Sequence, residues 1–140
     1  MTVLLWGIKS SLLSYVSGMA DGEIAVEAPA ERRDSAFAFP GEDVRFRGGV
    51  AVTGHSGLMR VRIGDPSLRS GPGGRWILEI ADPDEPAVRL PFAEVGSFDG
   101  EHGRGLRMTE HGADLFFGPY GPGTPVDDFQ ILGGAARGAD

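Results

Sequence analysis

The chain has 140 residues, a formal net charge of −7 and no cysteine. This length suits one domain, and the scattered acidic charge without a stripe of arginines excludes the electrostatic footprint of a nucleic-acid-binding protein. The lack of cysteine excludes disulfides, thiolate metal sites and a cysteine nucleophile. The 23 glycines and 10 prolines are spread along the chain, which predicts many short strands joined by tight turns.

The N-terminal residues are apolar but do not form a signal peptide. Residues 1–6 lack a basic leader and are too short for a signal core. No segment approaches the ~18 apolar residues of a membrane span. We therefore expect no membrane span and a cytoplasmic location, with one domain over residues 1–134 and a flexible tail over residues 135–140.

A short amphipathic helix is predicted over residues 6–16. Its apolar face comprises Ile8, Leu12, Tyr15, Val16 and Met19, which recur at three- and four-residue steps. Tyr15 is therefore predicted to point toward the core. By itself, a tyrosine on an apolar helix face is more typical of ordinary core packing than of a functional site.

The rest of the chain alternates between apolar and polar residues in short segments. Strands are predicted over residues 23–28, 35–39, 43–52, 59–63, 76–80 and 129–131, over 87–98 with an interruption at Pro91, and in a hairpin around residues 110–112. The connections are too brief for parallel crossovers, so the strands should be antiparallel. The predicted fold is mainly β: a two-sheet antiparallel β-sandwich or a flattened barrel with a short N-terminal α-helix.

Two turns in the middle of the chain are informative. The Gly48-Gly49 pair is either a hairpin turn or a bulge, and the apolar phase preserved across it favours a bulge within one long strand. The apolar phase then switches between Val52 and Met59, so residues 53–57 must reverse the chain. His55 lies at that reversal.

The other polar clusters have ordinary interpretations. His102 and His111 are predicted at loop tips, as solvated turns without metal-ligand spacing. The acidic run 82–85 lacks the ligand ladder of a calcium loop. The glycine-rich residues 71–74 precede a strand instead of opening a helix, which is wrong for a phosphate site.

The order of motifs along the chain resembles that of the HtaA domain, a family of haem-binding modules in Gram-positive haem uptake. The sharpest matches are Trp-Gly-Ile-Lys-Ser at 6–10, Gly-His-Ser-Gly-Leu at 54–58 and Tyr-Gly-Pro-Gly-Thr-Pro-Val-Asp at 120–127, the last preceded by the aromatic stretch 116–119. The resemblance extends from about Trp6 to Leu132, which is nearly the whole chain.

The resemblance implies a cofactor, ferric protoporphyrin IX, held by an axial tyrosine from the first helix. Tyr15 occupies that motif position and is the expected metal ligand, and His55 of the reversing turn supports it. A free phenol titrates near ~10, so a phenolate ligand at neutral pH needs the charge of the metal and a hydrogen-bond donor, a role His55 can fill. Met59 and Tyr120 are either pocket walls or ordinary core residues.

Two classes of function follow. The first is a haem-binding protein without catalysis, for transport, transfer or storage, whose partners are haem and another haem-transfer protein. The second is a cytoplasmic enzyme or carrier, for example a biosynthetic cyclase, that uses the same β pocket for another apolar molecule, with Tyr15 and His55 as an acid and base pair. Family members are usually exported, so a chain without a signal segment is expected to be an internal or trimmed form. The oligomeric state stays open.

Overall fold

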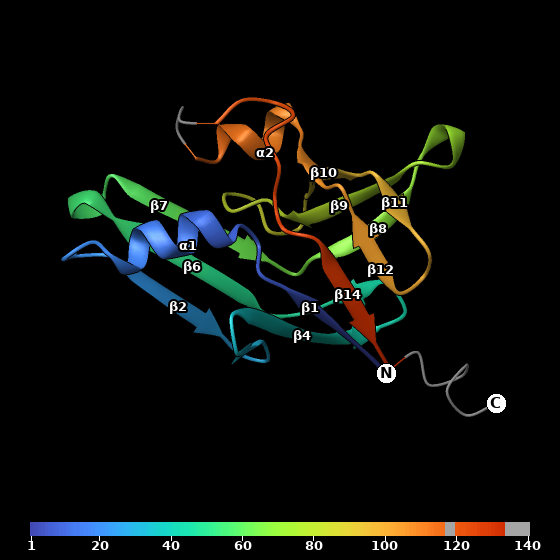
Figure 1. The fold of residues 1–140 in the computed structure, drawn as a ribbon, viewed down its shortest axis with the longest axis horizontal. Coiled ribbons are helices and arrows are strands. Elements are labelled where there is room, and N and C mark those ends of the chain that lie inside the picture. The colour runs from blue at the N-terminus through green and yellow to red at the C-terminus, as the bar shows by residue number, and fades with distance from the viewer. Residues whose placement is uncertain (117–119, 134–140) are drawn as a thin grey trace.

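The computed structural model of the chain describes residues 1–116 and 120–133. Residues 117–119 of the aromatic stretch and the predicted tail 135–140 lie outside the described residues. Over the described residues the fold is mainly β, with two antiparallel sheets and two α-helices (Figure 1), which confirms the predicted class. No helix in the described part of the chain is long and apolar enough to span a membrane.

The larger sheet contains eleven strands. In spatial order they are β11 (Ser97–Phe98), β12 (His102–Arg104), β14 (Phe129–Leu132), β1 (Thr2–Trp6), β4 (Ala36–Glu42), β5 (Arg45–Phe46), β8 (Ser67–Ser70), β9 (Trp76–Ala81), β10 (Arg89–Val95) and β13 (Arg107–Met108), with β3 (Glu31–Arg33) paired to β4. Because β11 follows β10 after one residue, the two ends of this order come together and the sheet curls. The predicted interruption at Pro91 is present, since the β9–β10 register shifts between Pro91 and Ala93.

The smaller sheet forms the side of the molecule where the candidate site described below lies. It comprises β2 (Glu23–Glu27), β6 (Gly49–Gly54) and β7 (Met59–Gly64), with β6 in the middle. The helix α1 (Ser10–Ser17) lies over this sheet (Figure 1). A short 3-10 turn, η1 (His55–Gly57), joins β6 to β7, so residues 53–57 reverse the chain as predicted.

The N-terminal segment differs from the prediction. Thr2–Trp6 is a strand in the larger sheet, paired on one side with β14 and on the other with β4, and the helix begins only at Ser10. Trp6 therefore belongs to a strand. Leu4 and Trp6 are buried while Val3 and Leu5 are half-buried. A strand covered on both faces reads as a continuous apolar run, which periodicity does not separate from the start of a helix.

The bulge predicted at Gly48-Gly49 is wrong. β5 belongs to the larger sheet and β6 to the smaller one, so the glycine pair is the point where the chain changes sheet. Gly48 has a φ of 110° and packs against the Ala30 backbone, so a side chain there would meet both strain and a clash. The apolar phase is preserved because both strands face one shared core.

Two other local predictions are also wrong. His102 lies in the strand β12, and the hairpin expected around residues 110–112 is a helix, α2 (Glu110–Asp114), which contains His111. The Thr109 hydroxyl accepts a hydrogen bond from the Gly112 N–H, which caps this helix. A further short helix, η2 (Pro72–Gly74), occupies the glycine-rich loop.

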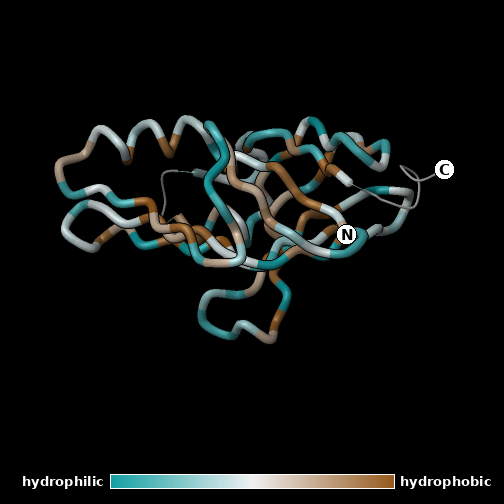
Figure 2. The backbone as a smooth tube through the Cα atoms, turned by 90° about the horizontal axis from the view of Figure 1, so that it is seen from below, coloured by the Kyte–Doolittle hydropathy of each residue, from teal (hydrophilic) through white to brown (hydrophobic). Residues whose placement is uncertain are grey.

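One hydrophobic core joins the two sheets and α1. Its largest fully buried side chains are Trp6, Phe37, Phe39 and Phe92. The Trp6 and Phe92 rings meet edge to face at 5.7 Å. In Figure 2 the hydrophobic stretches run mainly through the middle of the molecule, and the outer loops are largely hydrophilic. The core includes Leu12, Leu13 and Val16 of α1 and thus fixes this helix on the two sheets, whereas the η1 turn has no buried residue.

Candidate functional site

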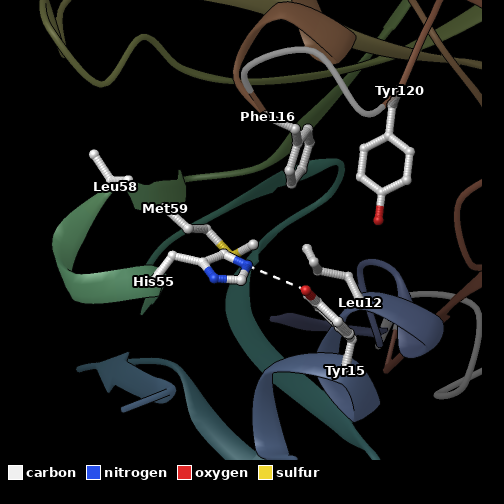
Figure 3. A pocket seen from close by; sticks show the side chains of 7 residues that line it. All are labelled: Leu12, Tyr15, His55, Leu58, Met59, Phe116 and Tyr120. Carbon is white, nitrogen blue, oxygen red and sulfur yellow. Dashed lines mark hydrogen bonds between the residues drawn. The ribbon is translucent and has the colours of Figure 1, made fainter. Parts of the chain in front are cut away.

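A cavity of about 420 Å³ lies between α1, the η1 turn and the segment after α2. Its lining is largely apolar and aromatic, and Figure 3 shows these side chains: Leu12, Tyr15, His55, Leu58, Met59, Phe116 and Tyr120. All four residues that the sequence singled out, Tyr15, His55, Met59 and Tyr120, line this one cavity. Its volume falls in the range of ~300–1,000 Å³ typical of small-molecule sites.

The first and last motifs of the chain meet at the start of α1. The Asp127 carboxylate accepts a hydrogen bond from the Ser10 N–H at 3.0 Å and another from the Ser10 hydroxyl. The Trp6 indole N–H donates to the Asp127 carbonyl at 2.9 Å. At Gly7 a Cβ would come within 2.5 Å of the Asp127 carboxylate, so a larger residue would displace this carboxylate. Asp127 thus satisfies the free helix N-terminus and orients the helix that carries Tyr15.

The prediction that Tyr15 points toward the core is wrong. The buried residues of α1 are Leu12, Leu13 and Val16, whereas 55% of Tyr15 is exposed. Tyr15 follows Leu12 by three positions, which places it at the border of the apolar stripe, and the helix periodicity alone does not say on which side of that border it lies. Its ring extends from the helix toward the η1 turn (Figure 3).

His55 meets Tyr15 across the cavity. A hydrogen bond joins the Tyr15 Oη to the His55 Nε2 at 3.1 Å, and the ring centroids are 5.9 Å apart. With a proton on Nε2 the imidazole donates to the tyrosine oxygen, and with Nε2 unprotonated the phenol donates to the imidazole. The pair therefore holds the tyrosine oxygen in a fixed place in either tautomer.

Aromatic rings form the opposite wall. Phe116 is buried and meets Tyr120 edge to face at 5.4 Å, while the Phe92 ring behind it, at 6.2 Å, connects this wall to the core. Burial raises the pKa of the Tyr120 phenol, and the nearby Tyr15 raises it further. The Lys9 ammonium lies 5.1 Å from the centre of the Tyr120 ring and donates to the Pro125 carbonyl. The Tyr120 phenol is thus held neutral at physiological pH.

Three lining residues were not predicted as site residues. Leu12 belonged to the predicted apolar helix face, Leu58 ends the Gly-His-Ser-Gly-Leu motif, and Phe116 begins the aromatic stretch. Leu58 is 82% exposed and lies at the outer edge of the cavity (Figure 3). An apolar side chain at the tip of a turn was the available signal for it, because turns are usually polar.

Comparison with known proteins shows the family to which the chain belongs. The HtaA family model, described as Htaa, matches residues 2–131. The chain belongs to the HtaA family. It is therefore a haem-uptake-related domain, as the order of motifs predicted. No curated protein sequence matches the chain.

Solved HtaA domains have the same fold. The C-terminal domain of HtaA from Corynebacterium glutamicum has a TM-score of 0.72 and 19% identity, with 93% of each chain covered. The N-terminal domain of the same protein has a TM-score of 0.69 and 20% identity, covering 93% of this chain and 94% of that one. A domain-swapped dimer of a histidine-to-alanine variant of the C-terminal domain has a TM-score of 0.60 and 19% identity, covering 91% of this chain and 92% of that one.

Proposed function

We propose that the domain binds ferric haem in this cavity, with the Tyr15 oxygen as the ligand of the iron. The observation that carries the proposal is the position of Tyr15. Its phenol is 55% exposed, lines an apolar and aromatic cavity, and is fixed by a 3.1 Å hydrogen bond to His55. A flat apolar ligand with a hard metal centre matches both the wall and the oxygen donor.

The Tyr15–His55 pair supplies the chemistry that such a ligand needs. An anionic oxygen prefers iron(III) to iron(II), and a phenolate forms at neutral pH when a cation and a hydrogen-bond donor stabilise it. With its proton on Nε2, the imidazole of His55 would be that donor, 3.1 Å from the tyrosine oxygen. Such a site would therefore hold oxidised haem and would hold it less tightly once the iron is reduced.

The open edge of the cavity supports transfer rather than permanent retention. Leu58 is 82% exposed and Tyr15 55% exposed, so a molecule bound between them keeps part of its surface accessible. A second haem protein can then contact the ligand before it leaves. The expected partner is another haem-transfer protein.

The test is a spectral titration of three proteins with ferric haem. The wild type should show a Soret band and the charge-transfer features of a phenolate ligand. Tyr15→Phe removes the ligand oxygen and keeps the ring, so these features should disappear with little loss of fold. Tyr120→Phe is the matched control, because it removes the other phenol of the same cavity. It should keep the phenolate features.

The outcomes separate the proposal from its alternative. Phenolate features that persist in Tyr15→Phe, or disappear in Tyr120→Phe, would show that the ligand is misassigned. A wild type without any Soret band would favour an enzyme or carrier for another apolar molecule. The observation that favours this alternative is the short Tyr15–His55 distance of 3.1 Å, which also suits an acid and base pair.

A further inference from the structure

The turn that presents His55 has an unfavourable backbone. His55, Ser56 and Gly57 have φ values of 51°, 57° and 88°, so two residues with side chains lie in the left-handed region in succession. Such positions are uncommon for residues other than glycine and cost free energy unless the surroundings stabilise them. Something outside the turn must hold His55 in this conformation.

A carboxylate from another segment provides this stabilisation. The Asp21 Oδ2 accepts a hydrogen bond from the Ser56 N–H at 2.5 Å. Asp21 is 35 residues away in sequence and lies in the connection between α1 and β2. A charged acceptor makes a stronger hydrogen bond with a backbone N–H than a neutral one does. The bonded N–H belongs to the peptide that directly follows His55, so the bond restrains the His55 backbone itself.

The same connection packs against the same turn through an apolar contact. At Gly54, just before His55, a Cβ would come within 2.8 Å of the Met19 sulfur. The Met19 sulfur thus lies against Gly54, the residue before His55, and the Asp21 carboxylate is bonded to Ser56, the residue after it. Tyr15 lies on the helix that leads directly into this connection.

We propose that Asp21 is a positioning residue of the haem site, which fixes the distance between the Tyr15 oxygen and the His55 Nε2. Asp21 is not among the residues that line the cavity. It acts by joining the end of the Tyr15 helix to the turn that carries His55. The consequence for haem binding rests on the proposed function, whereas the effect on the Tyr15–His55 pair does not.

Asp21→Ala removes the carboxylate and frees the turn. We expect haem affinity to fall by roughly tenfold, at the low end of the usual loss when a supporting partner of a metal ligand is removed. The phenolate band of Asp21→Ala should shift toward the band of His55→Ala, a variant in which the imidazole that faces the tyrosine oxygen is removed. Asp21→Asn keeps an acceptor oxygen without the charge, so it should lie between Asp21→Ala and the wild type. It also provides a milder change if Asp21→Ala folds poorly.

Asp99→Ala is the matched control. Asp99 is likewise an exposed carboxylate that accepts backbone N–H groups in a turn, from Glu101 at 2.8 Å and from His102 at 2.6 Å, but it lies away from the cavity. Its loss should leave haem affinity and the phenolate band unchanged. A change equal to that of Asp21→Ala would mean that any loosened turn has the same effect, and would overturn the proposal.

A double variant distinguishes positioning from general destabilisation. If Asp21 acts only through His55, then adding Asp21→Ala to His55→Ala should cause no further loss of affinity. If the double variant lost haem affinity by the product of the two single losses, the proposal would be overturned. It would also be overturned if Asp21→Ala alone bound haem as tightly as the wild type.

The haem-free protein gives a test that does not depend on the proposed function. In NMR spectra, wild type and Asp99→Ala should show contacts between the Tyr15 and His55 rings and slow exchange of the Ser56 amide proton. Both should be lost in Asp21→Ala. If the wild type binds no haem, these spectra still decide the role of Asp21, and unchanged ring contacts in Asp21→Ala would refute it.

Discussion

A phenol that is more than half exposed, yet fixed by an imidazole, is placed to contact something outside the chain. Tyr15 leaves 55% of its surface accessible while its oxygen is bonded to His55. A tyrosine that served only packing would bury its ring and leave its hydroxyl at the boundary. At the scale of single residues, the site is thus organised around the oxygen of Tyr15 and the nitrogen that faces it.

His55→Ala tests the support of that oxygen. The variant should keep Tyr15 as ligand, lose haem affinity by roughly ten- to a hundredfold and release haem sooner under a reductant. Because His55 is exposed, the melting temperature of the haem-free protein should change little. His102→Ala, in strand β12, is the control and should bind haem like the wild type. If haem dissociated at the same rate from the wild type, His55→Ala and His102→Ala, the role of His55 would be limited to shaping its turn.

Four of the seven residues that line the cavity could be named from the sequence, but their exposure could not be predicted. Tyr15 and His55 were found through the order of motifs, and they do line one cavity. The orientation of Tyr15 was wrong because exposure depends on where the helix meets the rest of the molecule. Asp21 was not found at all, since a carboxylate beside a Gly is an ordinary turn signal.

At the scale of elements, α1 depends on an anchor from the far end of the chain. Its N-cap residue Lys9 makes no capping hydrogen bond with its side chain, and Asp127 takes that role. Asp127→Ala should therefore destabilise the protein by about 0.5–2 kcal/mol, as the loss of an N-cap does. It should also weaken haem binding, because the helix that carries Tyr15 is less firmly held. Urea unfolding and a haem titration measure the two effects.

Asp128→Ala is the control for this anchor. Asp128 is the next residue and accepts a hydrogen bond from the Gly105 N–H at 3.0 Å, away from α1. Its loss should leave haem affinity unchanged. If Asp127→Ala also bound haem as tightly as the wild type, the orientation of Tyr15 would not depend on this anchor.

The smaller sheet contains an ion pair that responds to pH. The Glu27 carboxylate of β2 accepts hydrogen bonds from Arg62 of β7, at 3.0 Å from Nε and 2.7 Å from a terminal nitrogen. The hydrogen bonds from Arg62 lower the pKa of Glu27, against the opposing effect of burial. Because the folded pKa is lower than the unfolded one, the stabilisation is present above the unfolded pKa and is lost as pH falls through the folded pKa.

This direction of the pH dependence can be tested by comparing the stability of the wild type with that of Glu27→Gln. Both groups are about one-third or more exposed, so the pair should contribute only about 0.2–1 kcal/mol at neutral pH. The stability gap between the two proteins should close as pH falls below the ordinary glutamate pKa of 4.5 and through the lower folded pKa of Glu27. Urea unfolding at a series of pH values measures it, with Glu23→Gln on the same strand as control. A gap independent of pH would mean that Glu27 contributes by packing alone.

The type of an element could be predicted where it depends on the local sequence pattern. It could not be predicted where it depends on pairing with a segment far away in the sequence. The strands at residues 23–27 and 76–81 follow from alternation. The change of sheet at Gly48-Gly49 does not, because both strands keep the same inward phase. The helix α2 has only five residues, with a glycine and a histidine among them, so its propensity is weak, and it is stabilised by the Thr109 cap and by the burial of Gly112 and Ala113.

At the scale of the whole molecule, the fold is closed by its first and last strands. β1 lies between β14 and β4, so the N-terminal strand is interior to the larger sheet (Figure 1). The mainly β class and the antiparallel pairing followed from short strands and brief connections. The position of β1 did not, because one sequence contains no signal for a pairing between its two ends.

That pairing has a consequence for synthesis on the ribosome. The chain emerges from its N-terminus, so β1 and the Tyr15 helix leave the exit tunnel well before β14 exists, and Asp127 follows Ser10 by 117 residues. Until then β1 has one open edge, and contacts of such long sequence separation form late. The tyrosine therefore acquires its fixed direction only when translation of the domain is nearly complete. A nascent chain that still lacks Asp127 and β14 has no finished pocket, so the whole domain must be translated before the pocket can receive a ligand.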